Sequence, residues 1–129
     1  MNNFDRRDNI VAQLTASGIT TEIDWRRVPQ MNIYPVVVVT APKTVPVTAA
    51  NVVVKQQHKI FITCLVDAES IDLQDAEQAA KTLVLSVLTS LQGIRVSFDV
   101  NSESYSLGSN GTHTVYGGEL EITVYDTAN

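Results

Sequence analysis

The sequence predicts one α+β domain, in which a mixed, mainly antiparallel sheet is one layer and two helices form the second layer. Three observations lead to this prediction. Two β-forming runs lie between Ile33 and Asp67, an apolar stripe at helical spacing follows over residues 73–92, and strand-like alternation returns near the C-terminus. The 129 residues suit a single domain, and the chain has no repeat, linker or low-complexity tract.

The N-terminal part is expected to form a short amphipathic helix and then a half-buried strand. Apolar residues at helical spacing predict the helix over residues 3–17, and Gly18 stands where many helices end. Apolar and polar residues then alternate over residues 19–25, which predicts the strand. The Arg-Arg-Val-Pro-Gln segment at 26–30 is expected to be a solvated loop.

The next strand is predicted at residues 36–40, Val-Val-Val-Val-Thr. Because this run is apolar on both faces, we expect it in the middle of the sheet. Pro35 fits at the start of the strand, and Pro42 and Pro46 are expected to end it, since proline donates no ladder hydrogen bond.

A returning strand is predicted over residues 52–66, with its buried part beginning near Ile60. At ~3.3 Å per residue such a strand would reach roughly 50 Å, more than a small domain needs. The strand therefore either breaks near Gln57 or extends beyond the domain. We interpret residues 41–59 as a projecting β-hairpin arm that needs a partner surface.

The long helix is the clearest element of the sequence, because a continuous apolar stripe marks the face that would cover the sheet. Ser70 or Asp72 is expected to cap its start, and Gly93 follows its end. The stripe consists of Leu73, Ala76, Ala80, Leu83, Val84, Val87, Leu88 and Leu91.

Two more strands are expected after this helix. Residues 94–100 alternate, residues 101–104 are either a bulge or a polar continuation, and the Gly-Ser-Asn-Gly segment at 108–111 predicts a turn. Gly117 and Gly118 indicate a bulge or a close backbone approach. The last strand places Leu120, Ile122 and Val124 on one face.

The composition argues against most chemical functions. A net charge of −5 disfavours static nucleic-acid binding, which needs a basic surface. Cys64 is the only cysteine and is expected to be a buried thiol. His58 and His113 lie in polar segments and are expected to be exposed, without the convergent ligands of a metal site. We find no phosphate-binding glycine loop or nucleophile elbow, and we expect neither enzymatic activity nor a cofactor.

The sequence contains no pattern typical of secretion or membrane insertion. The N-terminus has no signal-peptide pattern and no segment approaches the ~20 apolar residues of a membrane span. We therefore expect a protein of the reducing cytoplasm, or of a particle assembled there, with no membrane contact.

The element order and two motifs resemble the tail terminator family of long-tailed bacteriophages (tail completion, minor tail protein U-like). The motifs are Tyr-Pro-Val-Val-Val at 34–38 and Glu-Leu-Glu-Ile-Thr-Val-Tyr at 119–125, with the Leu-Gln-Asp-Ala-Glu-Gln-Ala-Ala helix between them. The likeness covers nearly the whole chain by size and element order. The Val-rich, Pro-punctuated arm matches no motif of the family.

The resemblance implies a virion protein that forms a homo-oligomeric ring, a hexamer in this family. Such a ring caps the tail tube, stops its polymerisation and docks the head-completion or connector protein, while DNA passes through without specific binding. In this interpretation the arm contacts a neighbouring subunit or the tube through Lys43, Thr44, Val45, Val47, Val52, Val53, Val54, Lys55 and Gln57. The lumen or contact face would hold the carboxylates Glu103, Glu119 and Glu121, which would keep DNA from adhering.

Two other interpretations stay open at this stage. The chain could be a different phage component of the neck, head-completion or tube class, or a ferredoxin-like regulatory or small-ligand-binding domain. The last would require a pocket with convergent polar groups.

Overall fold

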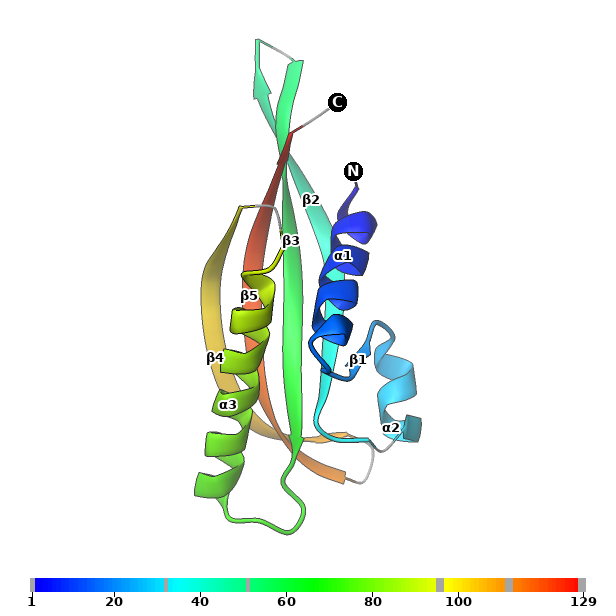
Figure 1. Ribbon diagram of the computed structural model, residues 1–129, viewed down its shortest axis with the longest axis vertical. Helices are drawn as coiled ribbons and strands as arrows, with labels where there is room; N and C mark the ends of the chain where they lie inside the picture. Colours follow the sequence, from blue (N-terminus) through cyan, green and yellow to red (C-terminus); the bar gives the residue numbers. More distant parts are fainter. Residues whose placement is uncertain (1, 32, 51, 95–96, 111–112, 128–129) are drawn as a thin grey trace.

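The computed structural model describes residues 2–31, 33–50, 52–94, 97–110 and 113–127. It is an α+β fold around a five-stranded sheet of order β1-β2-β3-β5-β4 (Figure 1). β1 is parallel to β2 and the other pairs are antiparallel, so the predicted mixed, mainly antiparallel sheet is confirmed. The elements are α1 (Asn3–Ala16), β1 (Thr21–Glu22), η1 (Trp25–Arg27), α2 (Val28–Met31), β2 (Val36–Ala49), β3 (Val52–Asp67), α3 (Leu73–Leu91), β4 (Phe98–Asn110) and β5 (His113–Thr127).

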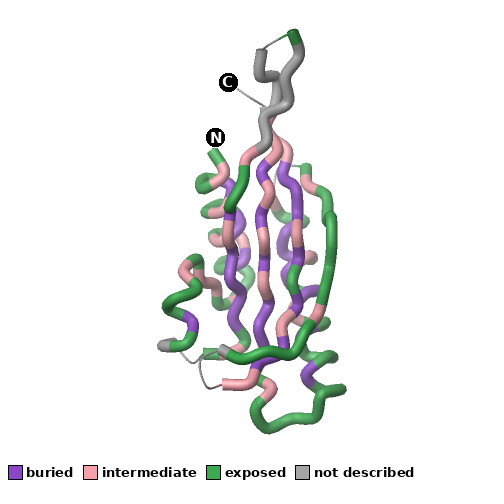
Figure 2. Tube along the Cα trace, turned by 180° about the vertical axis from the view of Figure 1, so that it is seen from behind, coloured by how far each residue is buried: buried purple, intermediate pink, exposed green. Residues whose placement is uncertain are grey.

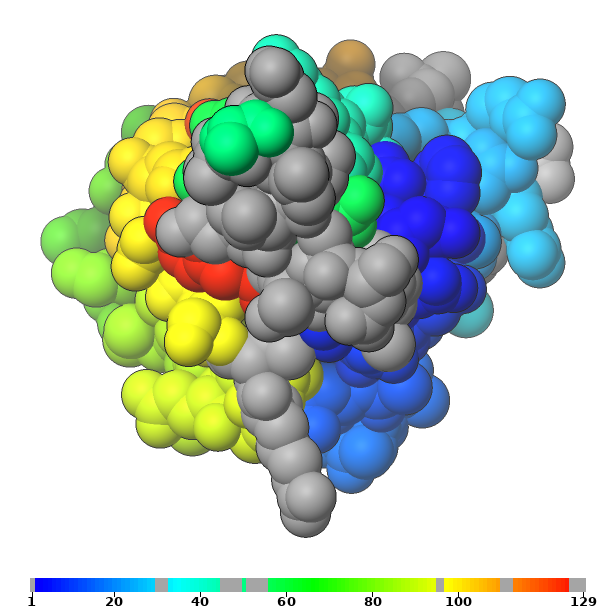
Figure 3. Space-filling model, turned by 90° about the horizontal axis from the view of Figure 1, so that it is seen from above, coloured from blue at the N-terminus to red at the C-terminus, as the bar shows by residue number. Residues whose placement is uncertain are grey.

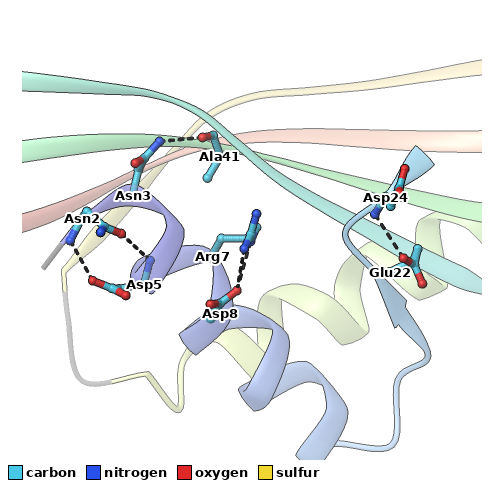
Figure 4. Close-up of polar contacts among 8 residues, drawn as sticks. All are labelled: Asn2, Asn3, Asp5, Arg7, Asp8, Glu22, Asp24 and Ala41. Atoms are coloured by element: carbon cyan, nitrogen blue, oxygen red, sulfur yellow. Dashed lines mark hydrogen bonds and ion pairs between the residues drawn. The ribbon is translucent and has the colours of Figure 1, made fainter. Parts of the chain in front are cut away.

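The predicted N-terminal helix is confirmed as α1. Asn2 caps it: its side chain accepts from the Asp5 N–H at 2.9 Å, and the Asp5 carboxylate accepts from the Asn2 N–H at 3.1 Å (Figure 4). Gly18 follows with φ +81°, the left-handed conformation expected of a residue that ends a helix. The Asn3 amide also donates to the Ala41 carbonyl at 2.6 Å, which ties the start of α1 to β2.

The strand predicted over residues 19–25 is mostly wrong, as is the loop predicted after it. Only Thr21 and Glu22 pair with β2, and Ile23 and Trp25 are 43% and 44% exposed. The Asp24 side chain accepts from the Arg26 N–H at 3.0 Å and so begins the helical turn η1, which continues into α2. Short polar side chains that bond local backbone offer such an alternative to a sheet ladder.

β2 does not end at Pro42 or Pro46, contrary to the sequence expectation. The register shifts between Thr40 and Lys43, so Pro42 lies within an irregularity of the ladder. Pro46 pairs with Gln56 of β3. The described pairing with β1 reaches only Val37 and Val38, so β2 is an edge strand at Pro46. Bulges and edges are the places where a strand tolerates proline.

β3 is continuous, which decides between the two expectations for this segment: it does not break near Gln57. Its even residues from His58 to Cys64 face α1 and α3, and Leu65 faces the opposite side. Both faces of the predicted central strand are therefore buried, as expected: Val37 and Val39 lie under α1 and α3, and Val36 and Val38 pack with Val28.

α1 and α3 pack on the same face of the sheet (Figures 1 and 2). The α3 stripe is confirmed at the buried Ala76, Ala80, Val84, Val87 and Leu91, while Leu83 and Leu88 are half-buried. Leu73 is the exception at 54% exposed, because it lies at the first turn, beyond the sheet. Asp72 is the residue at the N-cap, although its side chain makes no capping bond. Against the stripe lie Ile60, Ile62, Cys64, Leu120, Ile122 and Val124.

β4 begins later than predicted, at Phe98, and residues 95–96 lie outside the described part. The register shift between Val100 and Ser102 is a bulge, after which β4 continues to Asn110. The turn predicted at 108–111 is wrong for its first three residues, because Gly108, Ser109 and Asn110 pair with β5. Gly111, the fourth, lies outside the described part of the chain.

Of the two expectations for the glycine pair in β5, the bulge is wrong, and the close approach is made by side chains and not by another stretch of backbone. The β3–β5 and β4–β5 registers run through Gly117 and Gly118 without a shift. A Cβ on Gly118 would lie 2.7 Å from Val84 Cγ2 and 2.9 Å from Tyr105 Cε1. Gly118 thus allows α3 and Tyr105 to approach the sheet.

We predict that Gly118→Ala destabilises the domain by about 1–3 kcal/mol, because the added methyl group overpacks against the stiff, buried Val84. Urea unfolding followed by circular dichroism measures the change. Gly108→Ala is the matched control in β4, since a Cβ there meets nothing within 4 Å. Equal effects of the two substitutions would contradict this account of Gly118.

Candidate assembly surface

The base of the predicted arm belongs to the core. His58, expected to be exposed, is 0% exposed, and Ala41 is also buried. His58 lies on the helix-facing side of β3, and its Nδ1 is 3.2 Å from the Thr44 hydroxyl of β2. The register shift after Thr40 places Thr44 opposite His58. Sequence reasoning missed this because the polar neighbours of His58 hide the alternation that continues through it.

Farther along, the hairpin becomes two-stranded. The described β3–β5 pairing begins at Lys55, whereas β2 and β3 remain paired as far as Ala49 and Val52. Figure 1 shows this end of the hairpin beyond the ends of β4 and α1. Ala50 turns the chain with φ +52°.

The nine residues predicted to form the arm contact fall into two groups, those at the base of the hairpin and those farther along it. Lys43 is exposed, and Thr44 and Gln57 are half-buried at the base. The others lie in the paired strands, but their side chains are outside the described part: Val45, Val47, Val52, Val53, Val54 and Lys55.

The three carboxylates expected on one surface are separated. Glu119 and Glu121 lie on the face of β5 turned away from α1 and α3, because Leu120 between them is in the core. Glu103 pairs with Leu120 and so lies on the helix-facing side of β4, where the Tyr105 hydroxyl donates to it. Lys59 Nζ is 3.3 Å from Glu121 Oε1, which partly neutralises that carboxylate.

A polar cluster at the opposite end of the sheet was not anticipated. His113 Nε2 lies 2.8 Å from Asp67 Oδ1, and the His113 ring stacks on Tyr34 with centroids 5.0 Å apart. Asp67 accepts from the Glu69 N–H at 2.9 Å, and Glu69 accepts from the Thr114 N–H at 2.6 Å. These contacts join the end of β3 to the start of β5. No local pattern could indicate the contacts of His113 with Asp67 and of Thr114 with Glu69, because these partners are more than forty residues apart.

This cluster also lowers two pKa values. The Glu69 N–H, and then His113, hold the pKa of Asp67 below its ordinary value of 3.8. The hydrogen bond from Thr114 holds the pKa of Glu69 below 4.5. Both carboxylates are therefore ionised at neutral pH.

Two features that would indicate a metal site or a membrane span are absent from the described residues. Among them, no group of three or more His, Cys, Asp and Glu side chains could hold a metal ion. No described helix is long and apolar enough to cross a membrane. Cys64 is buried as predicted, and burial raises the pKa of its thiol to about 12.

No family model matches the sequence, and no curated protein matches it either. Among solved structures, the chain is similar to the core domain of a protein from Akkermansia muciniphila, with 13% identity, 98% of this chain and 85% of that chain covered, and a TM-score of 0.43. A second structure from that organism, described as lacking its transmembrane region, has 12% identity, coverage of 98% and 82%, and a TM-score of 0.43. These similarities assign neither a family nor a function.

We predict that the contribution of Asp67 and Glu69 to stability is complete above pH 5 and is lost as the pH falls through and below 4. Their pKa values are lower in the folded than in the unfolded chain, so acid favours unfolding. Urea midpoints between pH 3 and 7 measure this, and the double variant Asp67→Asn, Glu69→Gln should show a shallower acid-side decline. An unchanged decline would contradict the role of this cluster.

We predict that Cys64 is unreactive in the native protein. At pH 8 a buried thiol with a pKa of about 12 provides almost no accessible thiolate. Ellman's reagent should label one thiol per chain rapidly in 8 M urea and only slowly without denaturant. Rapid stoichiometric labelling of the native protein would contradict the burial of this strand.

Proposed function

We propose that this chain is a subunit of a bacteriophage tail terminator, which assembles as a ring, caps the tail tube and presents a docking face to the head connector. In this proposal its role is structural rather than enzymatic, its partners are further copies of itself, the tube protein and a head-completion or connector protein, and it is part of the virion. The observation that carries the proposal is the two-stranded end of the β2–β3 hairpin.

The hairpin end supports assembly on energetic grounds. An isolated two-stranded hairpin is marginally stable in water, and the pairing described beyond Lys55 is within the hairpin alone. The segment is nevertheless rich in valine, which suits a half-buried surface. A contact with another subunit or with the tube would supply the missing burial, and strand addition or side-chain packing would serve equally. We therefore assign the projecting arm to the part of the hairpin beyond the Thr44–His58 contact.

The acidic face supports the second part of the proposal. Glu119 and Glu121 lie on the side of the sheet turned away from α1 and α3, and the whole chain is negatively charged. We propose that these two carboxylates face the lumen, where negative charge lets DNA pass without adhering. Glu103 lies on the other face and is not part of this surface.

We predict that shortening the hairpin abolishes assembly without unfolding the domain. Residues 48–54 are replaced by Asn-Gly, which joins the paired residues Val47 and Lys55 through a favoured two-residue turn. This variant keeps the Thr44–His58 contact and the described β3–β5 ladder. Light scattering after size-exclusion chromatography, with and without tail tubes, should show rings for the wild type and monomers for the variant.

Ala50→Gly is the matched control, because glycine accepts the φ of +52° at the turn and leaves the hairpin length unchanged. This control should assemble normally. Normal rings from the shortened variant would contradict the role of the hairpin. A wild-type protein that stays monomeric even on tubes and binds a small ligand would overturn the proposal and favour the ligand-binding domain.

A further inference from the structure

Trp25 is an exposed aromatic residue on a fixed support. It is the only tryptophan in the chain and is 44% exposed at the start of η1. Asp24 caps this turn and also binds the Arg26 guanidinium at 2.9 and 3.0 Å, while Val28 is buried against β2 and β3. We call residues 24–28 the Trp25 lobe. Tryptophan and arginine are enriched among the residues that contribute most of the binding energy of protein interfaces.

A groove of about 600 Å³ lies between α3 and the segment that leads into β2, and Tyr34, which packs against the Val28 cluster of the other face, also lines it. Its lining includes the apolar groups Pro35, Val66, Ala79 and Leu83. Two carboxylates, Asp67 and Asp75, also line it. The volume is in the ~300–1,000 Å³ range of ligand clefts, so an indole ring has room in it. We call it the α3 groove.

The lobe and the groove are on opposite faces of the same molecule. Trp25 lines a depression with Thr63 and Leu65, which face away from α3, whereas Val66 of the groove packs with Ala76 and Ala80 of α3. In Figure 3 the light-blue lobe and the green part of α3 lie on opposite sides of the molecule. Trp25 therefore cannot fill the groove of its own chain, but it can reach the groove of a second copy.

We propose that the Trp25 indole of one copy docks in the α3 groove of the next copy, with Arg27 against Asp67 and Asp75. Arg26 is already engaged by Asp24, so we assign the ionic contact to Arg27. Asp67 is likewise engaged by His113, so Asp75 is the principal partner of Arg27 and Asp67 adds negative charge to the same groove. The contact pairs an apolar ring with an apolar groove and a cation with two carboxylates, which are complementary in shape and charge. Because it joins two different surfaces, it is heterologous, the kind of contact that closes into rings. The inference rests on the proposed ring and specifies how its subunits meet.

Trp25 itself reports on this contact. Since no other tryptophan contributes, ring assembly of the wild type should shift the emission maximum to shorter wavelength and reduce quenching by acrylamide. Unchanged emission and quenching in the assembled protein would overturn the inference.

Two variants test the two sides of the contact separately. Trp25→Ala removes the docking group, and Ala79→Arg fills the groove from an exposed position of α3 and repels Arg27. Each alone should weaken self-association by roughly 30-fold or more, the equivalent of a ~2 kcal/mol hot spot. Leu107→Ala, an exposed residue of β4 outside both surfaces, is the control and should assemble normally.

Mixing the two variants gives the decisive result. Trp25→Ala subunits keep an intact groove and Ala79→Arg subunits keep an intact lobe, so an equimolar mixture should form heterodimers but no rings. Sedimentation velocity distinguishes these species. Rings formed by either variant would overturn the inference while leaving the terminator proposal in place. If Ala79→Arg forms rings but no longer binds tubes, the groove binds the tube protein and not a second copy. Trp25-dependent open polymers, without closed rings or tube binding, would support the contact and overturn the terminator proposal.

Discussion

The structure depends on one constraint, the two-sided pairing of β3. This strand bonds β2 along one edge and β5 along the other, and its alternate residues Ile60, Ile62 and Cys64 form the floor on which α1 and α3 pack. A slip of one residue in either ladder would turn these side chains to the opposite face. The burial of one face therefore specifies the register of three strands at once, and Gly118 provides the space that lets α3 come close to them.

The same strand connects the core to the hairpin. The alternation that buries Ile60 continues to His58, and the irregularity at Pro42 shifts β2 so that Thr44 meets it. The β2–β3 hairpin thus has a packed, hydrogen-bonded base. Beyond Lys55, the last residue of β3 with a described partner in β5, β2 and β3 pair only with each other. The proposed assembly contact is therefore assigned to this part of the hairpin.

Cys64 and the cluster around Asp67 both have structural explanations in the described fold. The cysteine is buried with a raised pKa, and the polar cluster at Asp67 joins two strand ends. What distinguishes the outer surface is its asymmetry: the Trp25 lobe is on one face, the α3 groove on the other, and the hairpin extends from one end. The proposed ring contact depends on this asymmetry, because a head-to-tail contact joins two different surfaces.

Elements whose periodicity is long and uninterrupted could be predicted from the amino-acid sequence alone. The sequence predicted α1, α3, the buried Val36–Val39 segment and the inward face of β5, because spacing of apolar residues alone reports which side is buried. The conformation of residues 19–30 could not be predicted, because the Asp24 cap begins a helical turn where the sequence alternates like a strand. The continuation of β2 past Pro42 and Pro46 could not be predicted either, because it depends on an irregularity in the β2–β3 ladder and on the position of β2 at the sheet edge. Three features follow only from the assembled sheet: His58 is buried, Glu103 lies on the face opposite Glu119 and Glu121, and Asp67 contacts His113. Each depends on register between strands distant in the chain, and register is set by the packing of the whole sheet against its helices.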